Sequence, residues 1–246
     1  MSDFINAAIE ANEEIVRLLR ANSDGSIFSY ADSGESGIGF GGDRSLKIDL
    51  IAEEIFIKKL GAFGRINSEE CGPVGSGDDE IVIDPIDGSA NIASGIPYYG
   101  SSVSLKSGGK AVKSIVCNMA NDEYFVRDQD EFFRGALFDK TRFKIARQLR
   151  SQAGIFEKSY LRRSEAELLV KNGFKFRSPG ALALSLAYSH NARFVVSMGR
   201  HREYDIIAGL HLSGDLYSFV SAELIIISAD QAVFERLNAL LREGGI

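Results

Sequence analysis

A short apolar run that ends on an acidic turn constrains this chain more than any other feature. Residues 80–92 have the sequence EIVIDPIDGSANI, in which three β-branched residues lead directly into Asp84. Such a run is typical of a buried strand, and α/β proteins place their chemistry where buried strands end. Pro85 fixes one backbone dihedral and Gly88 is free to take a positive φ, so the chain can turn sharply enough for Asp84 and Asp87 to converge. We therefore expect an α/β fold with a carboxylate site at the end of this strand.

Hydrophobic periodicity predicts helices first, strands next and an alternation of the two in the second half of the chain. Apolar residues recur at three- and four-residue steps in residues 3–19 and 45–60, which indicates two amphipathic helices. The other predicted helices are 90–94, 165–172, 181–189, one from residue 204, and 229–242; the predicted strands are 65–68, 80–84, 98–105, 111–118, 123–126, 174–177, 193–197 and 223–227. This order favours helices and sheets packed in layers.

Residues 22–42 consist mainly of Ser, Asp and Gly with scattered aromatics, so we expect a loop there. Within it, Gly37, Gly39, Gly41 and Gly42 imitate a dinucleotide-binding glycine run. That fingerprint needs a strand before it and a helix immediately after it, whereas a helical segment precedes this one. We therefore favour a flexible hairpin over a nucleotide-binding loop.

Length, charge and cysteine content narrow the class of protein. A chain of 246 residues corresponds to one large domain or two closely joined ones. Lys and Arg total 28 against 34 Asp and Glu, a net charge of −6 with no basic block, so neither a nucleic acid nor a membrane is expected as a partner. No apolar run reaches the roughly 18 residues that span a membrane. Two cysteines, Cys71 and Cys117, are too few for a disulfide framework, which favours a reducing, cytoplasmic setting.

Several carboxylates accompany Asp84 and Asp87. The candidates are Glu69, Glu70, Asp49 and Asp205. Oxygen ligands without His or Cys suit Mg²⁺ or Mn²⁺ better than zinc or copper. The alternative is that Asp84 and Asp87 only cap a turn beside a solvated acidic loop at 78–80.

Four motifs in order give the chain a family resemblance. Residues 84–89 (DPIDGS) resemble the D-P-[IL]-D-G-[ST] signature of the inositol monophosphatase family of magnesium-dependent, lithium-sensitive phosphatases. Residues 42–53 look like the early helix of that family, 68–70 like its [ST]-E-E step, and 204–209 like its W-D-x-A-[AG]-G segment. Several motifs in the right order are far more specific than any one of them.

The resemblance implies a metal site and a cofactor. The implied metal ligands are Glu69, Asp84, the backbone carbonyl of Ile86, Asp87 and Asp205. They would hold two or three Mg²⁺ ions, with Mn²⁺ as a substitute and inhibition by Li⁺. One metal would activate a water for in-line attack on phosphorus, and the others would neutralise the phosphate and the leaving group.

The resemblance also implies the catalytic residues, which are Glu69, Asp49, Asp87 and Ser89. Asp49 matches a position that helps to orient the catalytic water or an auxiliary metal, and the Ser89 hydroxyl matches a position beside that water. Gly88 and Ser89 match the phosphate-binding positions. Glu69 is favoured as the ligand because adjacent side chains of a strand face opposite ways, and Glu70 is expected to lie behind the ligands without binding the metal itself.

Departures from the family pattern bear on the substrate. Met198 stands seven positions before Asp205, where enzymes that bind the inositol ring carry an acid, and a thioether accepts hydrogen bonds poorly. Leu182 adds bulk along the expected substrate wall. Arg200, with the two residues after it, is positioned to hold a second anionic group such as the far phosphate of fructose 1,6-bisphosphate, or else belongs to a solvated basic turn.

The resemblance implies a layered α/β fold, a five-layer α-β-α-β-α sandwich of the sugar-phosphatase type. We expect residues 1–246 to form a single domain, with most metal ligands in a sub-region of about 1–135, and Asp205 and the substrate wall in a sub-region of about 136–246. The expected function is hydrolysis of a small phosphorylated metabolite by a cytoplasmic homodimer. Two alternatives remain open: fructose 1,6-bisphosphatase or another sugar or nucleotide phosphatase activity, and a non-catalytic regulatory binding role.

Overall fold

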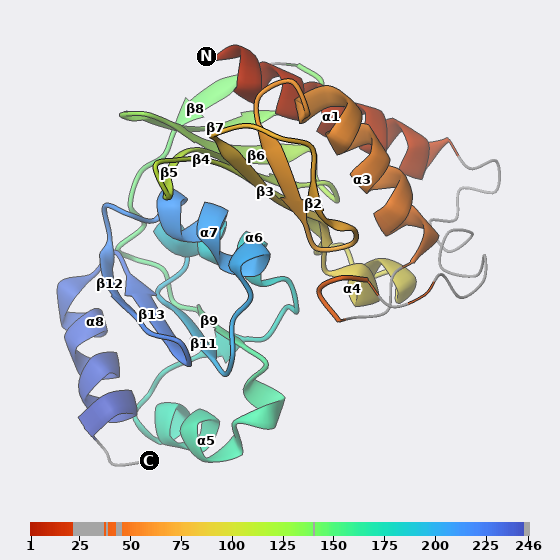
Figure 1. Ribbon diagram of the computed structural model, residues 1–246. Coiled ribbons are helices and arrows are strands. Elements are labelled where there is room, and N and C mark those ends of the chain that lie inside the picture. Colours follow the sequence, from red (N-terminus) through yellow and green to blue (C-terminus); the bar gives the residue numbers. More distant parts are fainter. Residues whose placement is uncertain (22–36, 38, 43–45, 140, 244–246) are drawn as a thin grey trace.

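The computed structural model describes residues 1–21, 37, 39–42, 46–139 and 141–243 (Figure 1). Most of the loop expected at 22–42 therefore lies outside the described residues. The helices are α1 Asp3–Arg20, α3 Lys47–Leu60, α4 Ser89–Ala93, α5 Arg163–Lys171, α6 Leu182–Ala187, α7 Glu203–Leu212 and α8 Gln231–Asn238, with short helical turns at Ser159–Leu161, Tyr188–His190 and Ala239–Glu243. None of the helices in these ranges is both long and apolar enough to cross a membrane.

The first sheet carries the acidic turn. Its strands are β1 Arg65–Ser68, β2 Gly72–Val74, β3 Glu80–Asp87, β4 Gly100–Ser107, β5 Lys110–Asn118, β6 Glu123–Asp128, β7 Glu131–Ala136 and β8 Arg142–Lys144. They lie in the order β2-β1-β3-β4-β5-β6-β7-β8, and the β1–β3 pair is parallel while the others are antiparallel. The parallel pair brings the carboxyl ends of β1 and β3 to the same edge.

The second sheet is built from the later part of the chain. Its strands are β9 Gly154–Glu157, β10 Phe176–Arg177, β11 Val195–Met198, β12 Tyr217–Val220 and β13 Leu224–Ser228. They lie in the order β10-β9-β11-β13-β12, with β9 parallel to both of its neighbours. Strands β12 and β13 form an antiparallel hairpin at one edge of this sheet.

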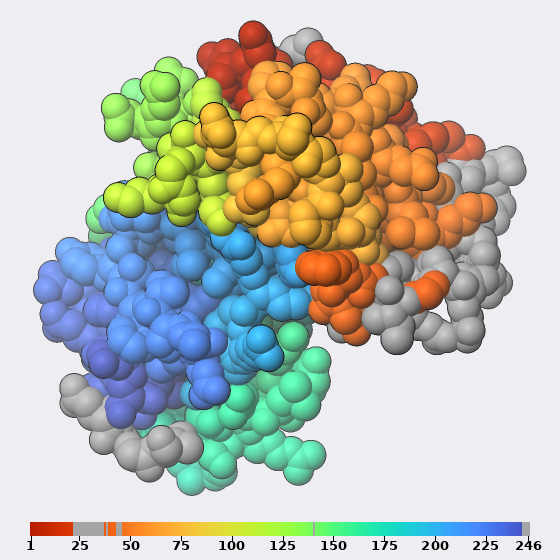
Figure 2. Space-filling view, viewed as in Figure 1, coloured from red at the N-terminus to blue at the C-terminus, as the bar shows by residue number. Residues whose placement is uncertain are grey.

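Five layers result from how these elements bury their apolar sides (Figure 1). Helices α1 and α3 cover one face of the eight-stranded sheet, α6 and α7 lie between the two sheets, and α5 and α8 cover the outer face of the second sheet. Alternate residues of β11 face opposite layers, with Val195 in the core beside α6 and Val196 in the core beneath α5 and α8. The predicted five-layer α-β-α-β-α sandwich is confirmed. Figure 2 shows the earlier part of the chain, coloured orange to green, packed against the later, blue part.

Five strands were missed by the sequence analysis. They are β2, β7, β8, β9 and β12, which have three, six, three, four and four residues. The turn before β7 passes through Gln129 at φ 57°, a residue that gives no turn signal of the Gly or Asn kind. Strand β9 is too short to show a period of two.

Candidate active site

The carboxylate cluster begins at the parallel pair of β1 and β3. Glu69 follows β1 directly, and its backbone N–H donates to the Ile83 carbonyl at 3.1 Å, which places it beside Asp84. Asp205 arrives from the first turn of α7. Carboxylate oxygens of Glu69, Asp84 and Asp205 all lie within 4.8 Å of one another. The ends of two neighbouring strands and the start of a helix far along the chain thus converge on one point.

Asp87 lies on the same strand, beyond an irregularity in the β3–β4 register that falls between Asp84 and Asp87. Its Oδ2 accepts a hydrogen bond from the Leu184 backbone N–H at 3.0 Å. The pKa of Asp87 is raised to about 8, mainly by burial. The hydrogen bond from Leu184 lowers this pKa, and the nearby charge of Asp205 raises it. The Asp87 carboxylate is therefore held by α6 and feels the charge of the cluster.

The buried carboxylates of this site repel one another, so a positive charge is needed to neutralise them. Asp84 is 2% exposed, and burial raises its pKa well above the usual value, with further increases from Glu69, Asp87 and Asp205. Arg202 meets part of this demand. Its Nη1 lies 2.6 Å from Glu69 Oε1, and its Nε and Nη2 donate to the two Asp205 oxygens at 2.9 and 3.0 Å. The positively charged guanidinium of Arg202 binds the same carboxylates that a metal ion would use. The chemistry of these residues therefore fits a divalent metal ion.

Asp49 and Ser89 form a second polar pair beside the acidic turn. The Ser89 hydroxyl lies 3.0 Å from Asp49 Oδ1 and 3.1 Å from the Ile86 carbonyl oxygen, and the Leu46 N–H donates to Asp49 Oδ2 at 2.5 Å. The pKa of Asp49 is raised to about 7, mainly by burial. The hydrogen bond from Leu46 lowers this pKa, and the charge of Glu70 raises it. Asp49 is thus poised to hold or release a proton near neutral pH.

Gly88 makes the turn between these two groups. Its φ is 93°, which favours glycine, and a Cβ there would lie 3.0 Å from the Tyr98 carbonyl oxygen and 3.2 Å from the Ala181 Cβ. Helix α4 begins at the next residue, Ser89. The turn and the Ala181 segment are therefore in close contact.

A cavity of about 700 Å³ opens beside the cluster. Its lining includes Asp205 and Arg202 together with Lys158, Arg200 and His201. The other lining residues are Phe40, Gly41, Gly42, Asn67, Glu203 and Tyr204. A basic rim next to an acidic centre suits a ligand that carries more than one anionic group.

Of the three residues predicted to bind substrate, Arg200 lines this cavity. Leu182 packs partly buried against the core between the sheets, and Met198 packs against the outer core of the second sheet. The tight contact between Arg202 and the acidic cluster was not foreseen. A basic residue three positions before Asp205, one helical turn away, was the available signal.

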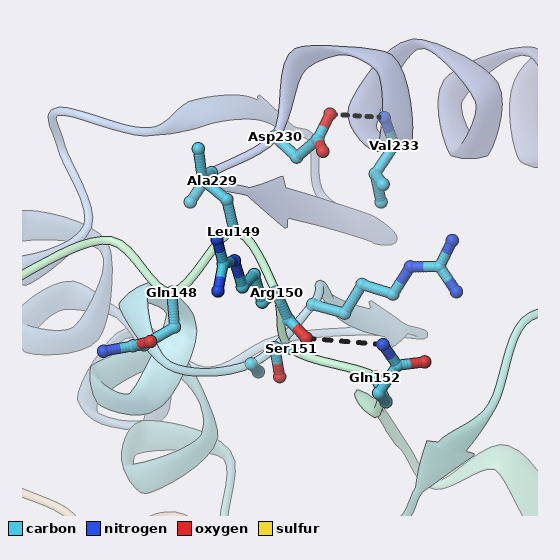
Figure 3. Close-up of a pocket in the computed structure, with 10 residues that line it drawn as sticks. Gln148, Leu149, Arg150, Ser151, Gln152, Ala229, Asp230 and Val233 are labelled. Carbon is cyan, nitrogen blue, oxygen red and sulfur yellow. Dashed lines mark hydrogen bonds between the residues drawn. The ribbon is translucent and has the colours of Figure 1, made fainter.

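A smaller pocket of about 210 Å³ lies between residues 148–152 and the start of α8 (Figure 3). Arg150 and Asp230 line it, and Asp230 Oδ1 accepts from the Val233 N–H at 3.2 Å. None of the residues predicted for the active site lines this pocket.

The fold and the acidic site define a metal-dependent phosphatase, the class that hydrolyses phosphoric monoesters. The model of the inositol monophosphatase family matches residues 41–212. The chain belongs to the inositol monophosphatase family.

Known proteins of this kind are similar over much of the chain. A fructose-1,6-bisphosphatase/inositol-1-monophosphatase from Thermococcus kodakarensis is 30% identical over 187 residues, which are 75% of this chain and 67% of that protein. The chain covers a smaller share, 56%, of a fructose-1,6-bisphosphatase from Pyrococcus furiosus. A Nus factor SuhB from Haemophilus influenzae is 25% identical over 100% of this chain and 91% of its own.

Solved structures show the same fold. An inositol monophosphatase from Thermotoga maritima superposes with a TM-score of 0.75 at 23% identity, over 99% of this chain and 100% of that one.

Proposed function

We propose that this protein hydrolyses a small phosphate monoester with two or three Mg²⁺ ions. The proposed ligands are Glu69, Asp84, the Ile86 carbonyl, Asp87 and Asp205. The observation that supports the proposal is the cluster of three carboxylates within 4.8 Å, two of which already hold a guanidinium. Mn²⁺ is expected to substitute and Li⁺ to inhibit.

The chain's own residues have distinct proposed roles in the reaction. Bound metal would lower the pKa of a water and neutralise charge on the phosphate. Asp49 would accept a proton through the Ser89 hydroxyl, which lies 3.0 Å from it. Gly88 and Ser89 would hold the phosphate where α4 begins. Glu69 and Asp87 would fix the position of the attacking water through the ions they ligate.

A sugar bisphosphate is the second candidate substrate. Lys158, Arg200 and His201 line the cavity beside the cluster, where a second phosphate can be bound. Met198 lacks the carboxylate that binds inositol hydroxyls in the family pattern. Two of the relatives carry fructose-1,6-bisphosphatase in their names, which supports this candidate.

We further propose a single domain over residues 1–246, a homodimer and a cytoplasmic location. One relative is named Nus factor SuhB, and that name supports the regulatory role as the alternative. Against a purely regulatory role stands the joint presence of Glu69, Asp84, Asp87, Asp205 and Ser89, since binding a partner does not require this set.

The test is phosphate release from inositol 1-phosphate, fructose 1,6-bisphosphate, histidinol phosphate and adenosine 3′,5′-bisphosphate. We expect release that requires Mg²⁺, falls with added Li⁺ and is lost in Asp87→Asn. Arg200→Ala should raise KM for the bisphosphate more than for inositol 1-phosphate. Metal binding without turnover of any compound would favour the regulatory role instead.

A further inference from the structure

Glu157 is a buried carboxylate that the proposed reaction does not use. It ends β9 in the second sheet and is 2% exposed. The Gly180 N–H donates to its Oε2 at 3.0 Å, and the Ser185 hydroxyl donates to its Oε1 in a short hydrogen bond. Burying a carboxylate is costly, so its hydrogen bonds to this one segment point to a specific role.

The segment that Glu157 holds begins with a turn that needs an anchor. Gly180 has a φ of 90°, and α6 starts two residues later with Ala181 in the N-cap position. Alanine has no side-chain acceptor for the free N–H groups at a helix start. The Glu157 carboxylate, which comes from β9, instead accepts from the Gly180 N–H, just before the N-cap, and from the Ser185 hydroxyl inside the helix, so it anchors the segment on both sides of the helix start.

The same segment holds Asp87. The N–H of Leu184, next to Ser185, donates to Asp87 Oδ2 at 3.0 Å. Asn91 holds the start of the segment in place, because its Nδ2 donates to the carbonyl of Pro179, the residue before Gly180, at 2.8 Å. A short hydrogen-bonded path therefore runs from Glu157 through residues 180–185 to the carboxylate of Asp87.

We propose that Glu157 is a positioning residue for Asp87, and that it acts by fixing the 180–185 segment whose Leu184 N–H orients the Asp87 carboxylate toward the cation site. This inference rests on the proposed metal role of Asp87. Partners that orient a metal ligand from behind typically change metal affinity by 10–100-fold when they are removed. A residue that only stabilises α6 would instead lower stability and leave the metal affinity of the folded protein unchanged.

The experiment is a calorimetric titration of the full-length chain with Mn²⁺, with thermal unfolding recorded for every variant. Glu157→Ala should weaken Mn²⁺ binding about tenfold. Glu157→Gln should lose less, because its amide oxygen still accepts from the Gly180 N–H. Ser228→Ala is the matched control. Ser228 is fully buried on β13 of the same sheet and donates to the Arg193 carbonyl at 2.8 Å, so its loss should reduce stability alone.

A double-mutant cycle separates this inference from the proposed function. In an Asp87→Asn background, Glu157→Ala should change Mn²⁺ affinity by less than about twofold, since the effect passes through Asp87. Unchanged affinity in both Glu157 variants, with affinity lost in Asp87→Asn, would overturn the positioning role and leave the metal site standing. Unchanged affinity in Asp87→Asn would overturn both. If Glu157→Ala fails to fold, the comparison of Glu157→Gln with Ser228→Ala decides the question.

Discussion

Arg202 donates hydrogen bonds from Nε and Nη2 to the two carboxylate oxygens of Asp205, and its Nη1 lies 2.6 Å from Oε1 of Glu69. The guanidinium thus bridges a residue that follows β1 and a residue of α7. Arg202 precedes α7 at its N-cap position and Asp205 lies in the first turn, so the helix start sets their spacing. The chain supplies its own counter-charge to a cluster that is suited to divalent ions.

Removing that counter-charge should strengthen metal binding. A divalent ion and the Arg202 guanidinium use the same oxygens of Glu69 and Asp205, so they compete. We expect Arg202→Ala to lower the Kd for Mn²⁺ by about three- to tenfold, the size of a partly exposed ion pair. Calorimetry measures this, with Arg200→Ala as a control of equal charge change. An equal gain in both variants would show that only overall charge matters.

Asp84→Asn should abolish stabilisation by Mg²⁺ and raise the stability of the metal-free protein. Asp84 is buried among Glu69, Asp87 and Asp205, whose charges raise its pKa, so a neutral amide relieves repulsion. In the presence of a chelator the variant should gain about 0.5–2 kcal/mol, or roughly 2–6 °C in Tm. Added Mg²⁺ should raise the Tm of the wild type and leave that of the variant unchanged. A variant less stable than the wild type in chelator would contradict the repulsion argument.

Asp49→Asn should separate catalysis from metal binding. Asp49 accepts from the Leu46 N–H and pairs with the Ser89 hydroxyl. An amide keeps the shape but cannot take a proton, so kcat should fall by about 10²–10³. Mn²⁺ affinity should stay within a few-fold of the wild type. A loss of affinity equal to that of Asp84→Asn would instead make Asp49 a metal ligand.

Acid should remove the contribution that His190 makes to stability. Burial lowers the pKa of His190 below 6.5, opposed by Asp215, whose Oδ1 lies 3.1 Å from its Nε2. Below pH 6.5 the unfolded chain binds a proton that folded His190 does not, so this contribution is full above that pH and falls as the pH drops toward the folded pKa. Asp49 and Asp87 act in the opposite direction, because burial raises their pKa values. The change in Tm between pH 7 and pH 5 should therefore be more favourable in His190→Gln than in the wild type.

Burial lowers the pKa values of His211 and His201 as well. His211→Gln and His201→Gln are accordingly the comparisons that divide the acid loss among the three histidines. If none of the glutamine variants changes the pH dependence of Tm, the loss belongs to other groups.

The sequence predicted the bounds of several helices and strands, including one short strand. Strand β1 agrees with its predicted bounds, and α1 extends the predicted helix by one residue. The carboxyl end of β3 was expected to carry an acid, and the parallel pairing of β1 with β3 brings Glu69, which follows β1, beside Asp84. Local patterns were sufficient here because the ligands follow directly on strongly patterned strands.

What the sequence could not give is contact between distant segments. Glu157 stands 70 positions after Asp87 and ends a strand of four residues, so no local period placed it near the site. Arg202 was interpreted as a ligand for anions, or as solvated charge, because a run of basic residues gives no sign of which acids it faces. Only packing of α6 and α7 between the sheets decides both contacts.

The turn at Gly88 offers a final test in which strain and contact are separated. Gly88 and Gly109 both have positive φ, at 93° and 79°, so an alanine at either position incurs a cost of about 1–2 kcal/mol. They differ in surroundings. A Cβ at Gly109 meets nothing within 4 Å, whereas one at Gly88 presses on the Tyr98 carbonyl oxygen and on Ala181.

Gly88→Ala should therefore lower kcat/KM at least tenfold, because it displaces Ser89 on one side and the Ala181 segment on the other. Gly109→Ala should cost similar backbone strain, seen as a Tm lower by a few degrees, and keep its activity. Assays of phosphate release alongside thermal unfolding compare the two. Equal activity in both variants would mean that the Ala181 segment yields to the added methyl and that the close contact at Gly88 does not control the site.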